Sequence, residues 1–326
     1  MTPVLSVRGL GHAFDAPGGG LFGGKRRFRA VDDVTFDLPK GEILGVVGES
    51  GCGKSTLARL VMRLYEPTDG EVLFEGNPIT HLSRHELRPL RRYLQMVFQD
   101  PYASIDPRQT IAEALSEPFE VQRVYLSRAE RRAEIERLLA LVSLDPAMAR
   151  NHPHHLSGGQ RQRVGIARAL ALKPRLIAFD EPTASLDVSV QAQVVELLLR
   201  LRAELNLTYL FISHDLALVD YLCDRVMVMY LGRVVEILPS RARARHPYTR
   251  ALIDAAFVPD PKARRTIDRV TGEIPSGFAD LPGCAFAARC PEAVAECRRV
   301  RPPLVGDGRR AVACHLAPPI AEISES

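Results

Sequence analysis

Hydrophobic and polar positions follow distinct patterns near the start of the 326-residue chain. Residues 4–8 and 30–38 alternate apolar and polar side chains, which predicts two antiparallel strands. Residues 17–27 between them are rich in glycine and predict a flexible loop. Residues 42–47 form an apolar run typical of a buried strand, and residues 56–64 have the pattern of a helix.

From about residue 82 to residue 144 the pattern becomes helical and charged, and Ser127 and Glu130 form a capping-box sequence that predicts a helix start. We interpret this region as a helical subdomain inserted into the fold. Strands and helices then alternate over residues 176–179, 188–205, 209–212, 216–222 and 225–231. This alternation predicts a mainly parallel sheet flanked by helices.

Length and charge narrow the class of protein. A chain of this length holds one large domain with an extension, or two domains. The formal net charge of +4 is spread along the sequence, so we expect no nucleic acid partner, which usually requires a clustered basic face. No apolar run reaches the roughly 20 residues of a spanning helix, and residues 1–10 do not have the pattern of a secretory signal. We therefore expect a cytosolic polypeptide.

The most informative motif is GESGCGKST at residues 48–56, between the predicted strand and helix. Its glycines allow backbone N–H groups to point at phosphate oxygens, and the helix N-terminus adds its positive end. Lys54 is expected to reach the β- and γ-phosphates, and the Ser55 hydroxyl to ligate Mg²⁺. The candidate nucleotide-binding residues here are Gly48, Ser50, Gly51, Cys52, Gly53, Lys54, Ser55 and Thr56. The sequence therefore predicts a phosphate-binding loop in a nucleotide-binding protein.

A second candidate cluster follows the apolar residues 176–179, which place Asp180 and Glu181 at the carboxyl end of a buried strand. Asp180 suits Mg²⁺, directly or through water. Glu181 is the better candidate for accepting a proton from, or orienting, the water that attacks the γ-phosphate.

Four further motifs occur in order along the chain: Gln99 within VFQDP, LSGGQ at residues 156–160, SLD at residues 185–187, and His214 within ISHD. With these motifs the chain resembles the ATPase subunits of ABC (ATP-binding cassette) transporters. The resemblance implies an α/β fold: a P-loop NTPase core with an antiparallel β subdomain, an inserted helical subdomain beginning near residue 82, and a small Cys-containing C-terminal extension.

The resemblance also implies roles for single residues. Gln99 would sense nucleotide and ligate Mg²⁺, and His214 would hold the γ-phosphate and the attacking water. Ser157 and Gly159 would contact the γ-phosphate bound to the phosphate loop of a partner cassette, and the helix at residues 161–172 follows the motif. Gly158, Gln160 and Asp187 are further candidate nucleotide-binding residues. Two cassettes would close head to tail around two ATP molecules, as a homodimer or a heterodimer. Phe14 is the expected aromatic contact of adenine, and Phe28 is its rival.

Beyond about residue 240 the chain contains four clustered cysteines, Cys284, Cys290, Cys297 and Cys314. Disulfides are disfavoured in the cytosol, so the cluster favours a metal. Four thiolates suit an iron–sulfur cluster, while the spacing lacks the close pair typical of structural zinc. Zinc, or free thiols without metal, stay open as alternatives.

The segment HPYT at residues 246–249, together with GCAF and RCP around the first two cysteines, narrows the resemblance. It is similar to the C-terminal extension of the dipeptide and oligopeptide importer ATPases, closest to the second ATPase of the dipeptide type. Some members carry a [4Fe–4S] cluster there, which implies that role for the four cysteines. We expect an ATPase domain at residues 1–240, with its helical subdomain at about 82–170, and an extension at residues 241–326.

The resemblance implies an ATP-hydrolysing subunit that powers the import of dipeptides or oligopeptides. Its partners would be a second ATPase subunit, two transmembrane permease subunits and, indirectly, an extracytoplasmic solute-binding protein, at the cytoplasmic face of the cell membrane. Tyr102 and Ala103 are candidates for contact with the permease subunits. Nickel, glutathione or another peptide-like solute are alternative cargoes. A soluble ABC ATPase acting on ribosomes or DNA, and a regulator that seldom hydrolyses ATP, are alternative functions.

Overall fold

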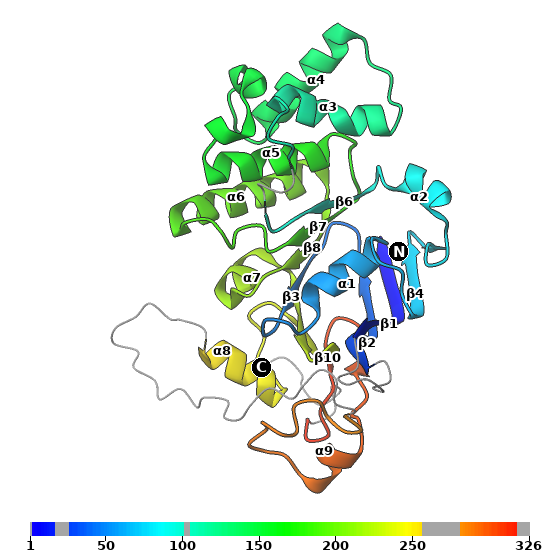
Figure 1. Cartoon of the computed structure of the whole chain (residues 1–326). Helices are drawn as coiled ribbons and strands as arrows, with labels where there is room; N and C mark the ends of the chain where they lie inside the picture. The colour runs from blue at the N-terminus through cyan, green and yellow to red at the C-terminus, as the bar shows by residue number, and fades with distance from the viewer. Residues whose placement is uncertain (1, 17–25, 101–104, 256–280, 318–326) are drawn as a thin grey trace, which may run out of the picture. The chain divides into compact units, whose positions relative to one another are not determined.

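The computed structural model describes residues 2–16, 26–100, 105–255 and 281–317 (Figure 1). Most of the predicted glycine-rich loop, and Tyr102 and Ala103, lie outside the described residues. The chain divides into two compact units. The first unit contains Pro39–Glu42 and His81–Ile212, and the second contains Thr2–Leu38, Ile43–Thr80 and Ser213–Ser326. The boundaries of the predicted domains remain a prediction.

The first unit is built on three parallel strands in the order β8-β7-β6. These are β6 (Leu94–Val97), β7 (Leu176–Asp180) and β8 (Thr208–Ile212). Its helices are α2 (Arg84–Leu90), α3 (Ile111–Val121), α4 (Arg128–Leu141), α5 (Gly158–Leu170) and α6 (Val188–Leu205), with 3-10 turns η1 (Pro146–Arg150) and η2 (Pro153–His155). In Figure 1, α5 and α6 lie beside these strands.

Every residue of β7 and β8 is buried, as the apolar runs in the sequence predicted. The Phe179 ring packs edge-on against the Tyr209 ring, with 5.0 Å between centroids. The Tyr209 hydroxyl donates a hydrogen bond of 3.2 Å to the carbonyl of Leu198, which satisfies its one polar group inside the core. Burial of each such ring contributes about 1.5–3 kcal/mol to stability.

Capping boxes begin four helices of this unit. Each box pairs a cap residue with the side chain three residues later, and the pairs are Ser83 with Glu86, Thr110 with Glu113, Ser127 with Glu130 and Ser157 with Gln160. In each box a hydroxyl accepts from a free N–H of the first turn, and the longer side chain accepts from the N–H of the cap residue. The predicted helix start at Ser127 is confirmed.

The region predicted to be helical also contains a strand. Residues 94–97 form β6, which pairs in parallel with β7 from Leu94 opposite Leu176 to Val97 opposite Phe179. Pairing with a buried strand outweighs the weak local preference of so short a segment.

The second unit contains an antiparallel sheet in the order β2-β1-β4-β5. Its strands are β1 (Leu5–Ala16), β2 (Arg26–Leu38), β4 (Asp69–Phe74) and β5 (Asn77–Pro78). The two predicted antiparallel strands are therefore confirmed as β1 and β2.

A second set of strands in this unit follows the order β11-β12-β10-β9-β3. It comprises β3 (Ile43–Val47), β9 (Arg225–Tyr230), β10 (Arg233–Pro239), β11 (Val305–Gly306) and β12 (Ala311–Val312). The pair β3 and β9 is parallel, and the other pairs are antiparallel. The helices are α1 (Lys54–Val61), α7 (Leu216–Leu222), α8 (Pro247–Ala255) and α9 (Ala295–Arg299).

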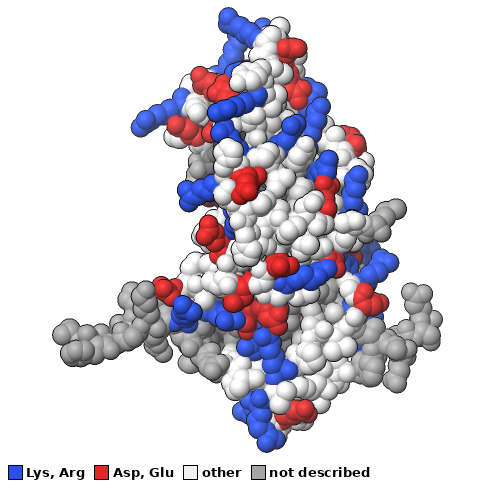
Figure 2. Space-filling model, turned by 90° about the vertical axis from the view of Figure 1, so that its right-hand side faces the viewer, with Lys and Arg blue, Asp and Glu red and all other residues white. Residues whose placement is uncertain are grey.

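Positive and negative side chains are mixed on the surface. On the face drawn in Figure 2, Lys and Arg side chains lie among Asp and Glu side chains. On α4, Arg132 pairs with Glu136 at 2.8 Å and Arg137 with Glu134 at 2.6 Å. Exposed pairs of this kind contribute about 0.3–0.5 kcal/mol each. In the part of the chain that the structure describes, no helix is long and apolar enough to span a bilayer.

Buried polar groups anchor the C-terminal segment of the second unit to β10. The Glu236 carboxylate is fully buried and accepts from the backbone N–H groups of Arg245, at 2.8 Å, and His246, at 3.0 Å. His246 in turn accepts from the N–H of Tyr248 at 3.1 Å. Burial lowers the pKa of the His246 imidazole from 6.5 to about 4, so the ring is neutral in the fold at neutral pH.

We predict an acid-sensitive contribution of His246 to stability. Because its pKa is lower in the folded chain than in the unfolded chain, its contribution is complete above pH 6.5 and is lost as the pH falls through about 4. By pH 4.5 the loss should be about 2–3 kcal/mol. His246→Asn keeps an acceptor for the Tyr248 N–H but does not titrate. Urea unfolding at pH 7.5 and pH 4.5 should show a smaller acid loss for the variant, and equal losses would contradict the prediction.

Candidate functional site

The segment predicted to bind phosphate joins β3 to α1, and α1 begins at Lys54. Gly53 caps this helix in the left-handed region, with φ of 104°. A Cβ atom at this position would lie 2.1 Å from the carbonyl oxygen of Ala30, so only glycine fits. The phosphate loop, residues 48–56, therefore packs closely against β2 at Gly53.

The Lys54 side chain is folded back over this loop. Its ammonium group is buried and donates to the carbonyls of Gly48, at 2.8 Å, and Glu49, at 3.0 Å. Of the other predicted loop residues, Ser50 and Gly51 are exposed, Cys52 is buried, and Ser55 and Thr56 lie half-buried in the first turn of α1. Burial raises the pKa of the Cys52 thiol, which favours its neutral form. A helix N-terminus with a lysine and two hydroxyls suits a phosphate chain.

His214 lies in the same unit as this loop. The N–H of Ser213 donates to the carbonyl of Val46 at 3.2 Å, which holds the turn beside the end of β3. Asp215 then caps α7 by accepting from the N–H of Leu218 at 3.1 Å. His214, between these two anchored residues, is exposed and beside the strand that leads into the phosphate loop.

In the first unit the structure brings Gln99 and Glu181 together. The Gln99 amide donates to the Glu181 carboxylate at 3.3 Å, although 82 residues separate them. Asp180, the last residue of β7, is buried, and Glu181 follows it with φ of 48°. Non-glycine residues seldom adopt this left-handed conformation, which destabilises the fold by about 1 kcal/mol. The turn thus holds Glu181 in a strained position at the carboxyl end of the strand.

The LSGGQ motif forms the start of α5. The helix begins at Gly158, three residues earlier than expected, because Ser157 and Gln160 close a capping box. A Cβ at position 159 would lie 2.3 Å from the Cγ1 of Val190, so the glycine permits contact with the start of α6. Asp187 caps α6, and a hydrogen bond from Ser189 lowers the pKa of its carboxyl. The predicted signature residues and Asp187 therefore meet at two neighbouring helix starts.

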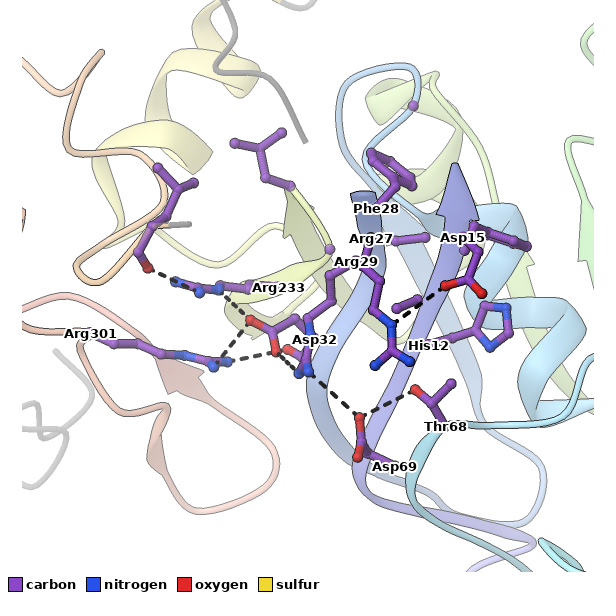
Figure 3. Close-up of a pocket in the computed structure, with 17 residues that line it drawn as sticks. His12, Asp15, Arg27, Phe28, Arg29, Asp32, Thr68, Asp69, Arg233 and Arg301 are labelled. Carbon is purple, nitrogen blue, oxygen red and sulfur yellow. Dashed lines mark hydrogen bonds and ion pairs between the residues drawn. The ribbon is translucent and has the colours of Figure 1, made fainter. Parts of the chain in front are cut away.

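A cavity of about 1020 Å³ lies beside the phosphate loop in the second unit (Figure 3). Gly51 lines it, as do Phe14 and Phe28, which face each other as partners on β1 and β2. The Phe14 ring also contacts the rings of His12, at 4.5 Å, and Tyr65, at 5.9 Å. The structure thus places both candidate adenine contacts at one cavity, with Phe14 the more exposed of the two.

Charged side chains form one wall of this cavity around Asp32, as Figure 3 shows. Arg29 and Arg233 bond its carboxylate at 2.8 and 2.7 Å, and Arg301 approaches at 3.3 Å. Burial alone would raise the pKa of the Asp32 carboxyl, but the hydrogen bonds from Arg29 and Arg233 and the charge of Arg301 outweigh it and hold the pKa below its usual value. Because Arg301 comes from the C-terminal extension, this extension contributes to the cavity.

The sequence analysis did not predict that the residues of this charged wall belong to the site. Arg233 and Arg301 bond Asp32 from 201 and 269 residues away. Neither belongs to a local motif, and no spacing in the chain indicates the contact.

The four cysteines lie in the described part of the C-terminal extension, and Cys284 donates its N–H to the carbonyl of Cys297 at 2.8 Å. Burial raises the pKa of the Cys284 thiol, and the charges of Cys297, Cys314 and Cys290 raise it further. The four thiols are thus within electrostatic reach of one another. Within the described residues, however, no group of three or more His, Cys, Asp or Glu side chains has the arrangement of a metal site. The ligand role expected for these cysteines therefore has no support from their arrangement.

Two family models match the chain: "ABC transporter" over residues 31–184, and "Oligopeptide/dipeptide transporter, C-terminal region" over residues 234–297. The chain is 49% identical to YkfD of Bacillus subtilis (strain 168), a protein named for oligopeptide transport, over 96% of this chain and 95% of YkfD. It is also 49% identical to the oligopeptide transport ATP-binding protein AppF of the same strain, over 88% of this chain and 89% of AppF.

Among solved structures, the chain is similar to the ATP-binding cassette MJ0796, described as a dimer in a post-hydrolysis state bound to ADP and Pi. The TM-score is 0.65 at 29% identity, and the match covers 73% of this chain and 100% of MJ0796. The ordered motifs, the P-loop fold and these matches agree, and the resemblance inferred from the sequence is confirmed. The chain belongs to the family of ABC transporter ATP-binding proteins, in the branch that has the oligopeptide/dipeptide transporter C-terminal region.

Proposed function

We propose that the chain binds MgATP through residues 48–56 and hydrolyses it to power a membrane importer of dipeptides or oligopeptides. The observation that carries the proposal is the phosphate loop, with a helix starting at Lys54 and a cavity lined by Gly51, Phe14 and Phe28 beside it. Backbone N–H groups and Lys54 would bind the phosphates. Phe14 would stack on the adenine.

The remaining site residues divide the hydrolytic chemistry among them. Glu181 orients the attacking water and accepts its proton. Gln99 senses the nucleotide and donates a hydrogen bond to the Glu181 carboxylate. His214 holds the γ-phosphate. Ser55, Asp180 and Gln99 are the residues that would hold Mg²⁺ through oxygen atoms, and the bound metal would neutralise charge on the phosphates.

We propose that Ser157, Gly158, Gly159, Gln160 and Asp187 serve the nucleotide of a second ATPase subunit. The N-terminus of α5 is a donor surface of the kind that binds phosphate, and the capping box fixes its geometry. Two such subunits, identical or related, close around two ATP molecules and reopen after hydrolysis. The dimeric description of MJ0796 supports this assembly.

The peptide cargo follows from the relatives, YkfD and AppF, whose names refer to oligopeptide transport, and from the C-terminal family match. The subunit would act at the cytoplasmic face of the membrane, bound to two permease subunits that receive solute from an extracytoplasmic binding protein. Its role in that assembly is the ATPase.

The four cysteines of the extension would hold a [4Fe–4S] cluster in the loaded protein, with zinc as the alternative metal. The support is the chemistry of the donors alone, because four cysteines of one extension could supply four thiolate ligands. The proposal requires these side chains to turn toward a common centre when the metal binds.

We predict that one substitution lowers the affinity for ATP and that another lowers only its hydrolysis. Lys54→Ala should weaken ATP binding about 10-fold, because a charged donor to the phosphates is lost. Glu181→Gln should keep ATP affinity but lower phosphate release about 100-fold or more, because the general base is lost. With ATP bound, the Glu181→Gln protein should accumulate as a closed dimer, measured by light scattering.

Glu204→Gln is the matched control for Glu181→Gln, because Glu204 is an exposed glutamate on α6. It should hydrolyse ATP like the wild type. Normal phosphate release by Glu181→Gln would refute the assignment of the base.

The aromatic pair is tested in the same binding assay. Phe14→Ala should weaken ATP binding about 10-fold, since stacking on a base contributes about 1–3 kcal/mol. Phe14→Tyr keeps an aromatic ring and should bind ATP like the wild type. Phe28→Ala is the matched control, because Phe28 faces Phe14 across the two strands and lines the same cavity. The reverse result would assign the adenine contact to Phe28.

Metal content tests the cysteine proposal. Protein purified without oxygen should contain iron and sulfide in equal amounts, with a brown visible absorbance, and Cys297→Ser should lose both. Cys52→Ser, at a cysteine outside the cluster, should keep the iron. Colourless protein that contains zinc alone, or no metal, would contradict the assignment.

A further inference from the structure

An arginine of the C-terminal extension contacts the phosphate loop. Arg289 donates to the Glu49 carboxylate at 2.9 Å and to the Tyr230 hydroxyl at 3.2 Å. Its guanidinium also lies 5.8 Å from the centre of the Tyr230 ring. The Arg289 side chain is only 7% exposed and that of Glu49 25%, so this ion pair is largely shielded from water. The pair joins residues 240 positions apart.

Glu49 is held at a second point by the same part of the chain. Its backbone N–H donates to the Tyr248 hydroxyl at 3.0 Å, while its carbonyl accepts from the Lys54 ammonium at 3.0 Å. The same residue therefore contacts Arg289, Tyr248 and the lysine expected to bind phosphate. Any shift of Glu49 would move a carbonyl that positions Lys54.

Packing makes the support for Arg289 rigid. The rings of Tyr230, Tyr248 and Phe286 are buried and in mutual contact, with centroids 4.7–5.4 Å apart. The N–H of Arg289 donates to the carbonyl of Phe286 at 2.9 Å, which fixes the arginine backbone to this cluster. Rings packed in this way have little rotational freedom, so Arg289 reaches Glu49 from a fixed base.

The charge of Glu49 gives Arg289 a specific task. A carboxylate within a loop that binds a triphosphate would repel the phosphates, and the repulsion is strong where water is partly excluded. The guanidinium is charged at neutral pH, and its hydrogen bond to Glu49 is the main cause that raises the pKa of Arg289 further. The ion pair therefore presents a neutral neighbour to the phosphates.

We propose that Arg289 is a positioning residue for ATP binding. It neutralises Glu49 and, with Tyr248, holds the phosphate loop in the conformation that accepts the triphosphate. The C-terminal extension thereby becomes part of the nucleotide site. The inference rests on the proposed function, in which residues 48–56 bind the phosphates of ATP.

The test is a cycle of substitutions with MgATP as the probe and calorimetric titration as the readout. Arg289→Gln leaves the Glu49 carboxylate uncompensated and should weaken MgATP binding about 10-fold. Glu49→Gln combined with Arg289→Gln removes both charges and should bind MgATP within about 3-fold of the wild type. Recovery of affinity by a second substitution is not expected of a residue that only supports the fold. Arg289→Lys keeps the charge and should also recover most of the affinity.

Arg250→Gln is the matched control, because Arg250 pairs with Glu292 on the exposed surface of the same unit. It should leave the affinity for MgATP unchanged, and the melting temperature of each variant is recorded alongside. The proposal is overturned if Arg289→Gln binds MgATP as tightly as the wild type, or if the double variant binds no better than Arg289→Gln.

If Arg289→Gln alone does not fold, the double variant decides, and a loss of about 10-fold or more there overturns the proposal. A wild-type protein that binds no MgATP would instead refute the proposed function.

Discussion

The close approach of the phosphate loop to its neighbours is the constraint on which the nucleotide site depends. At Gly53 the backbone touches the carbonyl of Ala30, and the N–H of Gly232 donates to the carbonyl of Cys52 at 2.9 Å. These contacts fix the direction in which α1 starts and therefore the direction of its free N–H groups. A phosphate site made from backbone needs this rigidity, because main-chain dipoles can attract an anion only when they already converge.

The same loop is attached to parts of the chain that follow it by about 180 residues or more. Gly232 lies in the turn between β9 and β10, Tyr248 lies in the first turn of α8, and Arg289 belongs to the extension. Buried carboxylates of this unit also have partners from distant segments. Arginines pair with Asp32, and backbone N–H groups donate hydrogen bonds to Glu236. Because unpaired charge inside a protein is costly, these contacts hold distant segments in one arrangement. The extension is thus integrated into the second unit.

Local signals in the sequence predicted the elements well, because their causes are local. The bounds of α6 and α7 agree with the periodicity, and the capping box at Ser127 begins a helix as its side chains dictate. Strand β6 was missed because four residues carry too little pattern, and its pairing partner is remote. The motifs predicted the candidate site residues, and the roles of these residues in catalysis stay predictions. The sequence could not predict the Asp32 cluster or the pair of Glu49 and Arg289, since both depend on tertiary contacts across more than 200 residues.

The left-handed backbone at Glu181 has a consequence for how this position can vary over evolution. Valine, isoleucine and threonine are branched at Cβ and would clash with their own main chain at φ of 48°. Asparagine and aspartate tolerate this conformation better than most residues. The backbone of the turn after β7 therefore disfavours β-branched residues at this position on steric grounds alone, independently of the chemistry that the side chain performs.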